Sequence, residues 1–244
     1  KDFKDQSVAD GISIYTDTRM LFLDYTPTQY PFTVVYTSVV ETSNTAFIPS
    51  WYPIENYFLS VQNSEVKFTF PSNLGFKFKE YNFEGYSIEK EVKDHSISYK
   101  ATNLQAFKRE DYSPSFTKFI PYVLFGLNKF HLEGVEGEAE DWQKFGSWVY
   151  TNLLVGTDEV SPETKAKIKA YVGSETDPMK IAQKVFEYVQ NKTRYVSIQL
   201  GIGGWKPMNA KDVDKLGYGD CKALSNYTRA LLGEVGVKSY YARL

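Results

Sequence analysis

The chain has 244 residues, with 28 Lys and Arg against 30 Asp and Glu, so its formal charge of −2 excludes recognition of nucleic acid or anionic membrane by bulk charge. Apolar residues make up 42% of the chain, and no apolar run approaches the roughly 18 residues that a membrane-spanning helix needs. The composition therefore predicts a soluble globular protein without a transmembrane segment. A single cysteine, Cys221, excludes an intramolecular disulfide.

Short β-type segments fill the chain from Ile12 to about Leu132. Eight of them are separated by turn residues: Ile12–Thr16, Arg19–Tyr25, Phe32–Val40, Glu65–Phe70, Phe76–Glu80, Tyr86–Val92, Ser96–Asn103 and Phe116–Phe125. Ser96–Tyr99 alternates polar and apolar residues, which is typical of a half-buried strand. Aromatic residues, which favour sheets, form 16% of the chain and mostly precede residue 150. We therefore predict an antiparallel β-sandwich-like domain over residues 1–135.

The pattern changes at Glu133–Asp141, an acidic stretch with glycines that predicts a domain junction. Apolar residues from Trp142 to Leu153 then recur at helical spacing. Ser161-Pro162 and Asp177-Pro178 each place an N-cap side chain before a proline, which predicts helices over residues 162–172 and 178–192. Residues 136–244 are thus predicted to form a second, helical domain, and the fold class is α+β.

Shorter elements are predicted after residue 192. They are a strand at Tyr195–Leu200, loops at Gly201–Pro207 and Gly217–Gly219, a helical turn at Ala210–Lys215 and a helix from about Cys221 to Glu234. Gly236 is expected to end that last helix, and Val237–Leu244 has the composition of the first strand of a sheet.

The segment Tyr218-Gly219-Asp220-Cys221-Lys222 is the best candidate for chemistry. Asp220 is suited to be an N-cap, which would place Cys221 in the first helical turn, where free N–H groups and the helix dipole favour a negative charge. A thiolate is the nucleophilic form of cysteine. The alternative is a buried cysteine that acts as a small hydrophobe. A helical wheel places Cys221 on one face, expected to turn into the fold, with Leu224, Thr228, Leu231, Leu232 and Val235.

Few other residues are candidates for a catalytic group. His95 stands in a predicted turn and His131 precedes the acidic stretch, and we expect both to be structural. Asp17, Asp212 and Asp214 are expected to be solvated carboxylates.

No cofactor or metal site is predicted. One cysteine and two separated histidines give no zinc-binding spacing. The loop Gly201-Ile202-Gly203-Gly204-Trp205 lacks the spacing of a phosphate-binding loop. Trp205 and Tyr218 could wall a substrate groove or belong to the core.

Several of these segments resemble the front half of a bacterial transglutaminase-like domain: Tyr195–Gly201, Gly203–Pro207, Tyr218–Lys222 and Ala230–Leu232. In that family a papain-like core places a cysteine at the start of a helix, and a histidine and an aspartate follow on strands. The N-terminal part, with Asp17-Thr18-Arg19 and Phe47–Pro53, resembles the poorly characterised β-rich domain often fused ahead of it in bacterial envelope proteins.

The resemblance implies that Cys221 is a nucleophile that attacks an amide carbonyl and forms a thioester. Whether hydrolysis, deamidation or cross-linking follows stays open. Only 23 residues follow Cys221 and none is histidine, so the resemblance implies that the base lies beyond Leu244 and that this chain alone is inactive. The implied substrate is a peptide, a protein or an envelope glycan, in the periplasm or cell envelope, with the cytoplasm left open.

The alternative is a non-catalytic binding or scaffolding protein. In that case the cysteine domain is degenerate, and the β-domain binds a peptide or a glycan. The missing base and the large aromatic β-domain favour this alternative.

Overall fold

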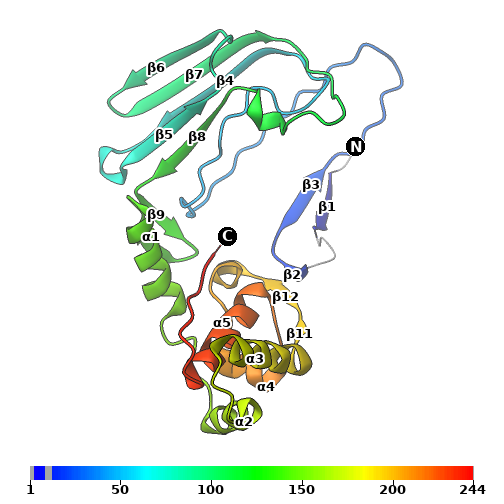
Figure 1. Ribbon diagram of the computed structural model, residues 1–244. Coiled ribbons are helices and arrows are strands. Elements are labelled where there is room, and N and C mark those ends of the chain that lie inside the picture. The colour runs from blue at the N-terminus through cyan, green and yellow to red at the C-terminus, as the bar shows by residue number, and fades with distance from the viewer. Residues whose placement is uncertain (1–2, 9–12, 244) are drawn as a thin grey trace. The chain divides into compact units, whose positions relative to one another are not determined.

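The computed structural model describes residues 3–8 and 13–243 (Figure 1). Contacts divide the chain into two compact units. One, here called the helical unit, comprises Lys1–Val40 and Ser147–Leu244, and the other, the β-unit, is Glu41–Gly146. The predicted α+β class is confirmed, because antiparallel strands in the N-terminal part are followed by helices. The predicted division at residue 135 stays a prediction, although the first 40 residues group with the later helices.

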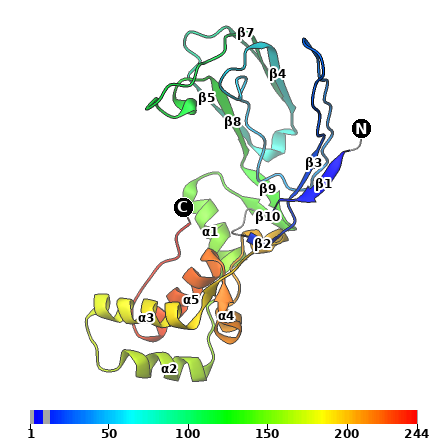
Figure 2. The same ribbon diagram turned by 90° about the vertical axis from the view of Figure 1, so that its right-hand side faces the viewer.

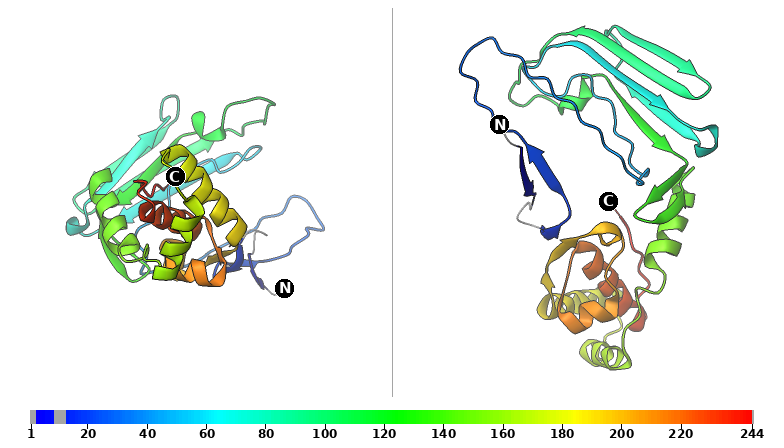
Figure 3. Two further views of the ribbon diagram at one scale, coloured as in Figure 1. Left: turned by 60° about the horizontal axis from the view of Figure 1, so that its bottom comes forward. Right: turned by 180° about the vertical axis from the view of Figure 1, so that it is seen from behind.

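The β-unit is built from antiparallel strands. A three-stranded sheet has the order β4-β7-β6, a second sheet pairs β5 with β8, and β9 and β10 form a hairpin (Figure 3, right). The bounds are β4 Val61–Thr69, β5 Phe76–Tyr81, β6 Ile88–Lys93, β7 Ser96–Leu104, β8 Tyr122–Leu127, β9 Lys129–Leu132 and β10 Val135–Glu138, with 3-10 turns η1 at Ser72–Leu74 and η2 at Phe116–Lys118.

Aromatic side chains form the core of the β-unit. Tyr99 on β7 is fully buried and stacks on Trp51, with ring centroids 5.6 Å apart. Its hydroxyl donates a 2.6 Å hydrogen bond to Glu80, so the buried polar atom has a partner. Ile97, Tyr99 and Ala101 are all buried, which confirms the alternation read from the sequence.

The strand predicted over Phe32–Val40 is wrong, because this segment has no ladder partner among the described residues. Within the acidic stretch Glu133–Asp141, Val135–Glu138 pairs with Lys129–Leu132 across a turn with positive φ at Glu133 and Gly134. His131, on β9, binds the backbone carbonyl of Ser43 through its ring, 2.9 Å away.

The helical unit contains most of the helices. Helix α1 crosses the sequence boundary between the units, and a π-helical turn, η3, follows it. The bounds are α1 Trp142–Val149, η3 Tyr150–Leu154, α2 Pro162–Val172, α3 Pro178–Lys192, α4 Ala210–Leu216 and α5 Cys221–Glu234, with a 3-10 turn, η4, at Gly201–Gly204. None of the helices described is both long and apolar enough to cross a bilayer.

Helix α5 is central to this unit and contacts α2, α3 and α4 (Figure 2). The shared core includes Ile168 from α2, Val185 from α3, Val213 from α4 and Tyr227 and Leu231 from α5, all fully buried. The predicted helices 162–172 and 178–192 are confirmed, and the Ser161 and Asp177 side chains accept from the backbone N–H groups of Thr164 and Met179.

Short strands complete the helical unit. Strand β1 pairs antiparallel with β3, β2 pairs in parallel with β12, and β11 pairs in parallel with β13. Their bounds are β1 Lys4–Ser7, β2 Ser13–Thr16, β3 Arg19–Phe22, β11 Arg194–Tyr195, β12 Ser197–Gln199 and β13 Tyr218–Gly219. Two predicted strands reach outside the described residues, at Ile12 and Leu244. Residues 237–243 form no strand, contrary to expectation.

Asp214 on α4 corrects a further prediction, because it is not a solvated carboxylate. It accepts hydrogen bonds from Thr164, at 2.8 Å, and from the buried Tyr227, and it forms an ion pair with Lys192. Burial acts to raise the pKa of Asp214, but these three donors outweigh it, and the pKa lies below its ordinary value. One carboxylate thus joins α2, α3, α4 and α5.

We predict that Asp214→Asn lowers the free energy of unfolding by about 1–3 kcal/mol at pH 7, because buried donors lose their charged acceptor. Since the pKa of folded Asp214 is depressed, its contribution is present above about pH 4 and is lost as pH falls through the folded pKa. Urea unfolding of both proteins at several pH values should show the difference shrinking below pH 4.

Glu163→Gln serves as the control for this prediction. It removes an exposed ion pair between Glu163 and Lys167, which both lie on α2. It should leave the unfolding free energy almost unchanged at every pH. If Asp214→Asn lowered the free energy of unfolding by the same amount at pH 3 and at pH 7, the negative charge of Asp214 would not be the source of its stabilising effect.

Candidate functional site

Cys221 is the first residue of α5, as predicted. The Asp220 side chain accepts a 2.9 Å hydrogen bond from the backbone N–H of Ala223, which confirms Asp220 as the N-cap. Cys221 is exposed, so it is not the buried hydrophobe of the alternative interpretation. Its sulfur therefore lies at a helix N-terminus and is open to reagents, while its role as a nucleophile stays a prediction.

Gln199 on β12 connects that strand to the start of α5. Its side-chain N–H groups donate to Ser197, at 3.0 Å, and to Asp220, at 3.1 Å, and its carbonyl accepts from Lys222, at 3.3 Å. Lys222 also forms an ion pair with Asp220, and the side chains of this pair are 10% and 8% exposed. The two residues that flank Cys221 are thus fixed by one glutamine.

Two tyrosines lie beside the thiol. Burial, the negative charge of a Cys221 thiolate and a hydrogen bond to Cys221 raise the pKa of Tyr195, against a hydrogen bond from Ser197 that acts to lower it. The pKa of Tyr241 is also raised, mainly by burial. The positive charge of Arg243 acts to lower it, and the charges of Cys221 and Asp220 act to raise it further. Both phenols therefore stay protonated at neutral pH, and Tyr195 is a hydrogen-bonding partner of the sulfur.

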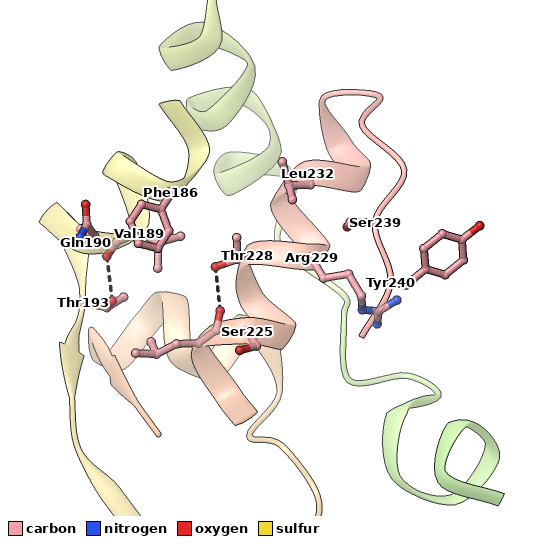
Figure 4. Close-up of a pocket in the computed structure, with 11 residues that line it drawn as sticks. Phe186, Val189, Gln190, Thr193, Ser225, Thr228, Arg229, Leu232, Ser239 and Tyr240 are labelled. Carbon is pink, nitrogen blue, oxygen red and sulfur yellow. Dashed lines mark hydrogen bonds between the residues drawn. The ribbon is translucent and has the colours of Figure 1, made fainter. Parts of the chain in front are cut away.

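The helical face that contains Cys221 turns into the fold in part, as predicted. Leu231 is fully buried, and Leu224, Leu232 and Val235 pack against the same core, whereas Cys221 is exposed. Leu224, Thr228 and Leu232 also line an open groove of about 640 Å³ (Figure 4). Phe186, Val189 and Thr193, from the region of α3, form the opposite wall, and Ser239 and Tyr240 form the third side (Figure 4). The groove begins one helical turn after Cys221.

The two predicted substrate-binding residues lie on separate elements. Trp205 follows η4 and is half-buried, and the Arg243 guanidinium lies 3.8 Å from its ring centre. Tyr218 is on β13, where it pairs with Arg194. Their role in substrate binding stays a prediction.

No histidine accompanies Cys221 in its own unit. Both histidines of the sequence, His95 and His131, belong to the β-unit, where His95 is exposed in the turn between β6 and β7. Asp17, exposed as expected, accepts a 3.0 Å hydrogen bond from the backbone N–H of Gly201. Within residues 3–8 and 13–243, no group of three or more His, Cys, Asp or Glu side chains is arranged to hold a metal ion.

Sequence reasoning missed Tyr195, Gln199 and Tyr241. They come from segments 20 or more residues away from Cys221 in either direction, and no local pattern connects them to it. The alternation in Ser197–Gln199 of polar, apolar and polar residues was a signal that two polar side chains share one side of the strand.

Comparison with known proteins gives two matches. Residues 1–108 match the profile of a domain of unknown function that has a solved structure, DUF3857. The crystal structure of a protein described as a "putative protease", from Parabacteroides distasonis, superposes with a TM-score of 0.50 and 13% sequence identity, over 79% of this chain. The match spans only 36% of that protein's length, and at this identity it concerns the fold. No curated protein matches the chain.

Gly219 generates a prediction for the start of α5. A Cβ atom at this buried residue would lie 2.8 Å from the Ala223 Cβ and 3.4 Å from a methyl group of Leu224. The Ala223 Cβ is fixed to the backbone of α5, so the clash can be relieved only if the backbone of β13 or α5 moves. Gly219→Ala should therefore lower the free energy of unfolding by about 1–3 kcal/mol.

Gly203→Ala is the matched control, since a Cβ atom at Gly203 meets no atom within 4 Å. It should change the unfolding free energy by less than about 0.5 kcal/mol. Thermal or urea unfolding of the two variants beside the unchanged protein measures both effects. Equal stability of the two variants would show that β13 does not pack directly on α5.

Proposed function

We propose that this chain carries the nucleophile of a cysteine-dependent amide hydrolase or acyltransferase of the transglutaminase-like kind. The observation that carries the proposal is the exposed Cys221 at the N-terminus of α5, which Asp220 caps. The start of α5 also presents free backbone N–H groups, which can stabilise the oxyanion that an attack by this sulfur would form.

The comparisons support a hydrolase-like function in a general way. The protein from Parabacteroides distasonis is described as a "putative protease", and domains of the type matched by residues 1–108 occur in transglutaminase-like proteins. The sequence resemblance to the front half of the transglutaminase-like domain supports a more specific proposal, namely that Cys221 is the nucleophile. Peptides or proteins are the proposed substrates, and the bacterial cell envelope is the proposed location.

The proposed reaction begins when a base removes the thiol proton of Cys221. The sulfur attacks the carbonyl carbon of an amide, a C–S bond forms, and backbone N–H groups at the start of α5 stabilise the oxyanion. The C–N bond then breaks, the amine leaves with a proton, and water or another amine resolves the thioester. Since the helical unit contains no histidine, we propose that the base is a histidine from outside this unit.

We predict that Cys221 is alkylated by iodoacetamide much faster than free cysteine at pH 6–7, where an ordinary thiol, with a pKa near about 8.5, is mostly protonated. Rates measured by mass spectrometry over pH 5–9 provide the test. Slow alkylation that follows the profile of free cysteine would contradict the proposal, and so would alkylation that occurs only after unfolding.

A matched pair of variants tests the environment of the thiol. Tyr195→Phe removes the phenol that hydrogen-bonds to Cys221, and the alkylation rate at pH 6–7 should fall several-fold. Tyr218→Phe changes a half-buried tyrosine on the neighbouring strand and should leave the rate as it was. Equal rates for the two variants would exclude Tyr195 from a role in thiolate stabilisation.

A further inference from the structure

Asp220 and Lys222, the residues on either side of Cys221 in the sequence, form an ion pair that is largely removed from water. Their side chains are 8% and 10% exposed, so both charges depend on partners within the protein in place of solvent. The two formal charges cancel, which leaves the thiol next to a neutral pair. The balance lasts only while the flexible lysine side chain keeps its ammonium on the carboxylate.

The side-chain amide of Gln199 contacts both members of this pair from strand β12. Its Nε2 donates to the Asp220 carboxylate, at 3.1 Å, and its Oε1 accepts from the Lys222 ammonium, at 3.3 Å. An amide carries donors and an acceptor on one planar group, so it can bind a carboxylate and an ammonium at the same time. Gln199 therefore completes a triangle of three hydrogen-bonded side chains.

Gln199 is itself fixed in position. Its Nε2 also donates to Ser197, which is 2% exposed, at 3.0 Å. Gly204, the last residue of η4, approaches from another side, since a Cβ atom there would lie 3.6 Å from Oε1. The opposite orientation of the amide would turn Oε1 to the Asp220 carboxylate and Nε2 to the ammonium, so the two charges select the orientation that is observed.

The titratable groups around the thiol come from α5, from β11 and from the residues after α5. Asp220 and Lys222 flank the thiol on α5, Tyr195 approaches from β11, and Tyr241 lies in the segment after α5, where the Arg243 guanidinium affects the pKa of its phenol. Burial raises the pKa of both phenols, so they are uncharged at neutral pH. If the ammonium moved into water, an unbalanced carboxylate would remain next to the thiol, and a like charge disfavours a thiolate.

We propose that Gln199 is a positioning residue for the reaction of Cys221. By binding Asp220 and Lys222 together, it holds the ammonium on the carboxylate, so that no unbalanced negative charge opposes formation of the thiolate. The inference rests on the proposed function and adds a control on the thiol that lies outside α5. Gln199 acts through Lys222 and does not touch the reacting atoms.

Two substitutions of Gln199 test the proposal. Gln199→Leu removes the amide, and Gln199→Glu places a second carboxylate beside Asp220. Alkylation by iodoacetamide, in which the sulfur displaces iodide and the thiol proton passes to the buffer, is followed by mass spectrometry from about pH 5 to about pH 10.5. At about pH 6.5 the rate should fall roughly threefold for Gln199→Leu and roughly tenfold for Gln199→Glu, and the rates should converge above about pH 10, where the thiolate is formed in every variant.

Gln183→Leu and Gln183→Glu are the matched controls. Gln183 is exposed on α3 and donates to Glu187 of the same helix, so the same changes of polarity and charge are made outside the triangle. Both controls should keep the alkylation profile of the unchanged protein. Thermal unfolding of every variant shows that the alkylated protein is folded, and Gln199→Glu, which keeps the size of the side chain, provides the test if Gln199→Leu does not fold.

Lys222→Met shows whether Gln199 acts through the ammonium. This substitution should lower the rate at about pH 6.5 by roughly tenfold, because it leaves the Asp220 carboxylate without its countercharge. Gln199→Leu added to Lys222→Met should cause no further loss, since the group that Gln199 positions is already absent. An equal loss from Gln199→Leu in both backgrounds would overturn the proposal.

The outcomes distinguish the inference from the proposed function. Profiles of the two Gln199 variants that equal that of the unchanged protein, or a loss of rate that persists above about pH 10, would overturn the positioning role. If the unchanged protein reacted like free cysteine, the proposed function would be overturned, and the shift caused by Gln199→Glu would still be measurable. A shift that appears in the Gln199 variants, is absent from the Gln183 variants and vanishes on the Lys222→Met background supports the inference.

Discussion

The Asp220 carboxylate is the interaction on which the site depends. One oxygen accepts from the Ala223 N–H and begins α5, and the other accepts from Gln199 and pairs with Lys222. A carboxylate this well buried is tolerated only when it is paired and hydrogen-bonded, so each partner is required. Because these partners come from β12 and from the two residues that follow Cys221, a single side chain fixes the strand and the start of the helix together.

Helix α5 has a buried inner face and an exposed first residue, Cys221. Its inner face, with Ala223, Asn226, Tyr227, Ala230 and Leu231, is buried, and Tyr227 reaches Asp214 across the core. Asn226 donates to the backbone carbonyl of Thr157, at 2.9 Å, and so links α5 to the loop before α2. These contacts hold the helix rigidly from behind, while its first residue stays exposed. Such an arrangement suits a group that must keep a fixed position and yet be reached by a substrate.

The sequence predicts the later helices well because their signals are local. Ser161-Pro162, Asp177-Pro178 and Asp220 each define a helix start within four residues, and the observed bounds agree. The position of Cys221 in the first turn follows from the same signal.

Features that depend on distant partners were not predictable. Phe32–Val40 has every property of a strand except a neighbour to pair with, and a strand is stable only within a sheet. Asp214 looks like a surface residue until Lys192 and Tyr227 are brought to it by other helices. Gln199 likewise acquires its hydrogen-bonding role only when β12 packs beside the start of α5. Propensity and periodicity are local properties of the sequence, so they do not predict such long-range contacts.

The parallel pairing of β2 with β12 has a consequence for biosynthesis. Asp17 and its partner Gly201 are 184 residues apart, so at about 5–20 residues per second the ribosome completes the partner roughly 10–40 s after Asp17. The β-unit, whose residues are contiguous, can fold during that interval, whereas strand β2 waits for its partner β12. Val34, Val35 and Val39 remain at least 62% exposed even in the folded protein, so this apolar stretch is uncovered both before and after that pairing.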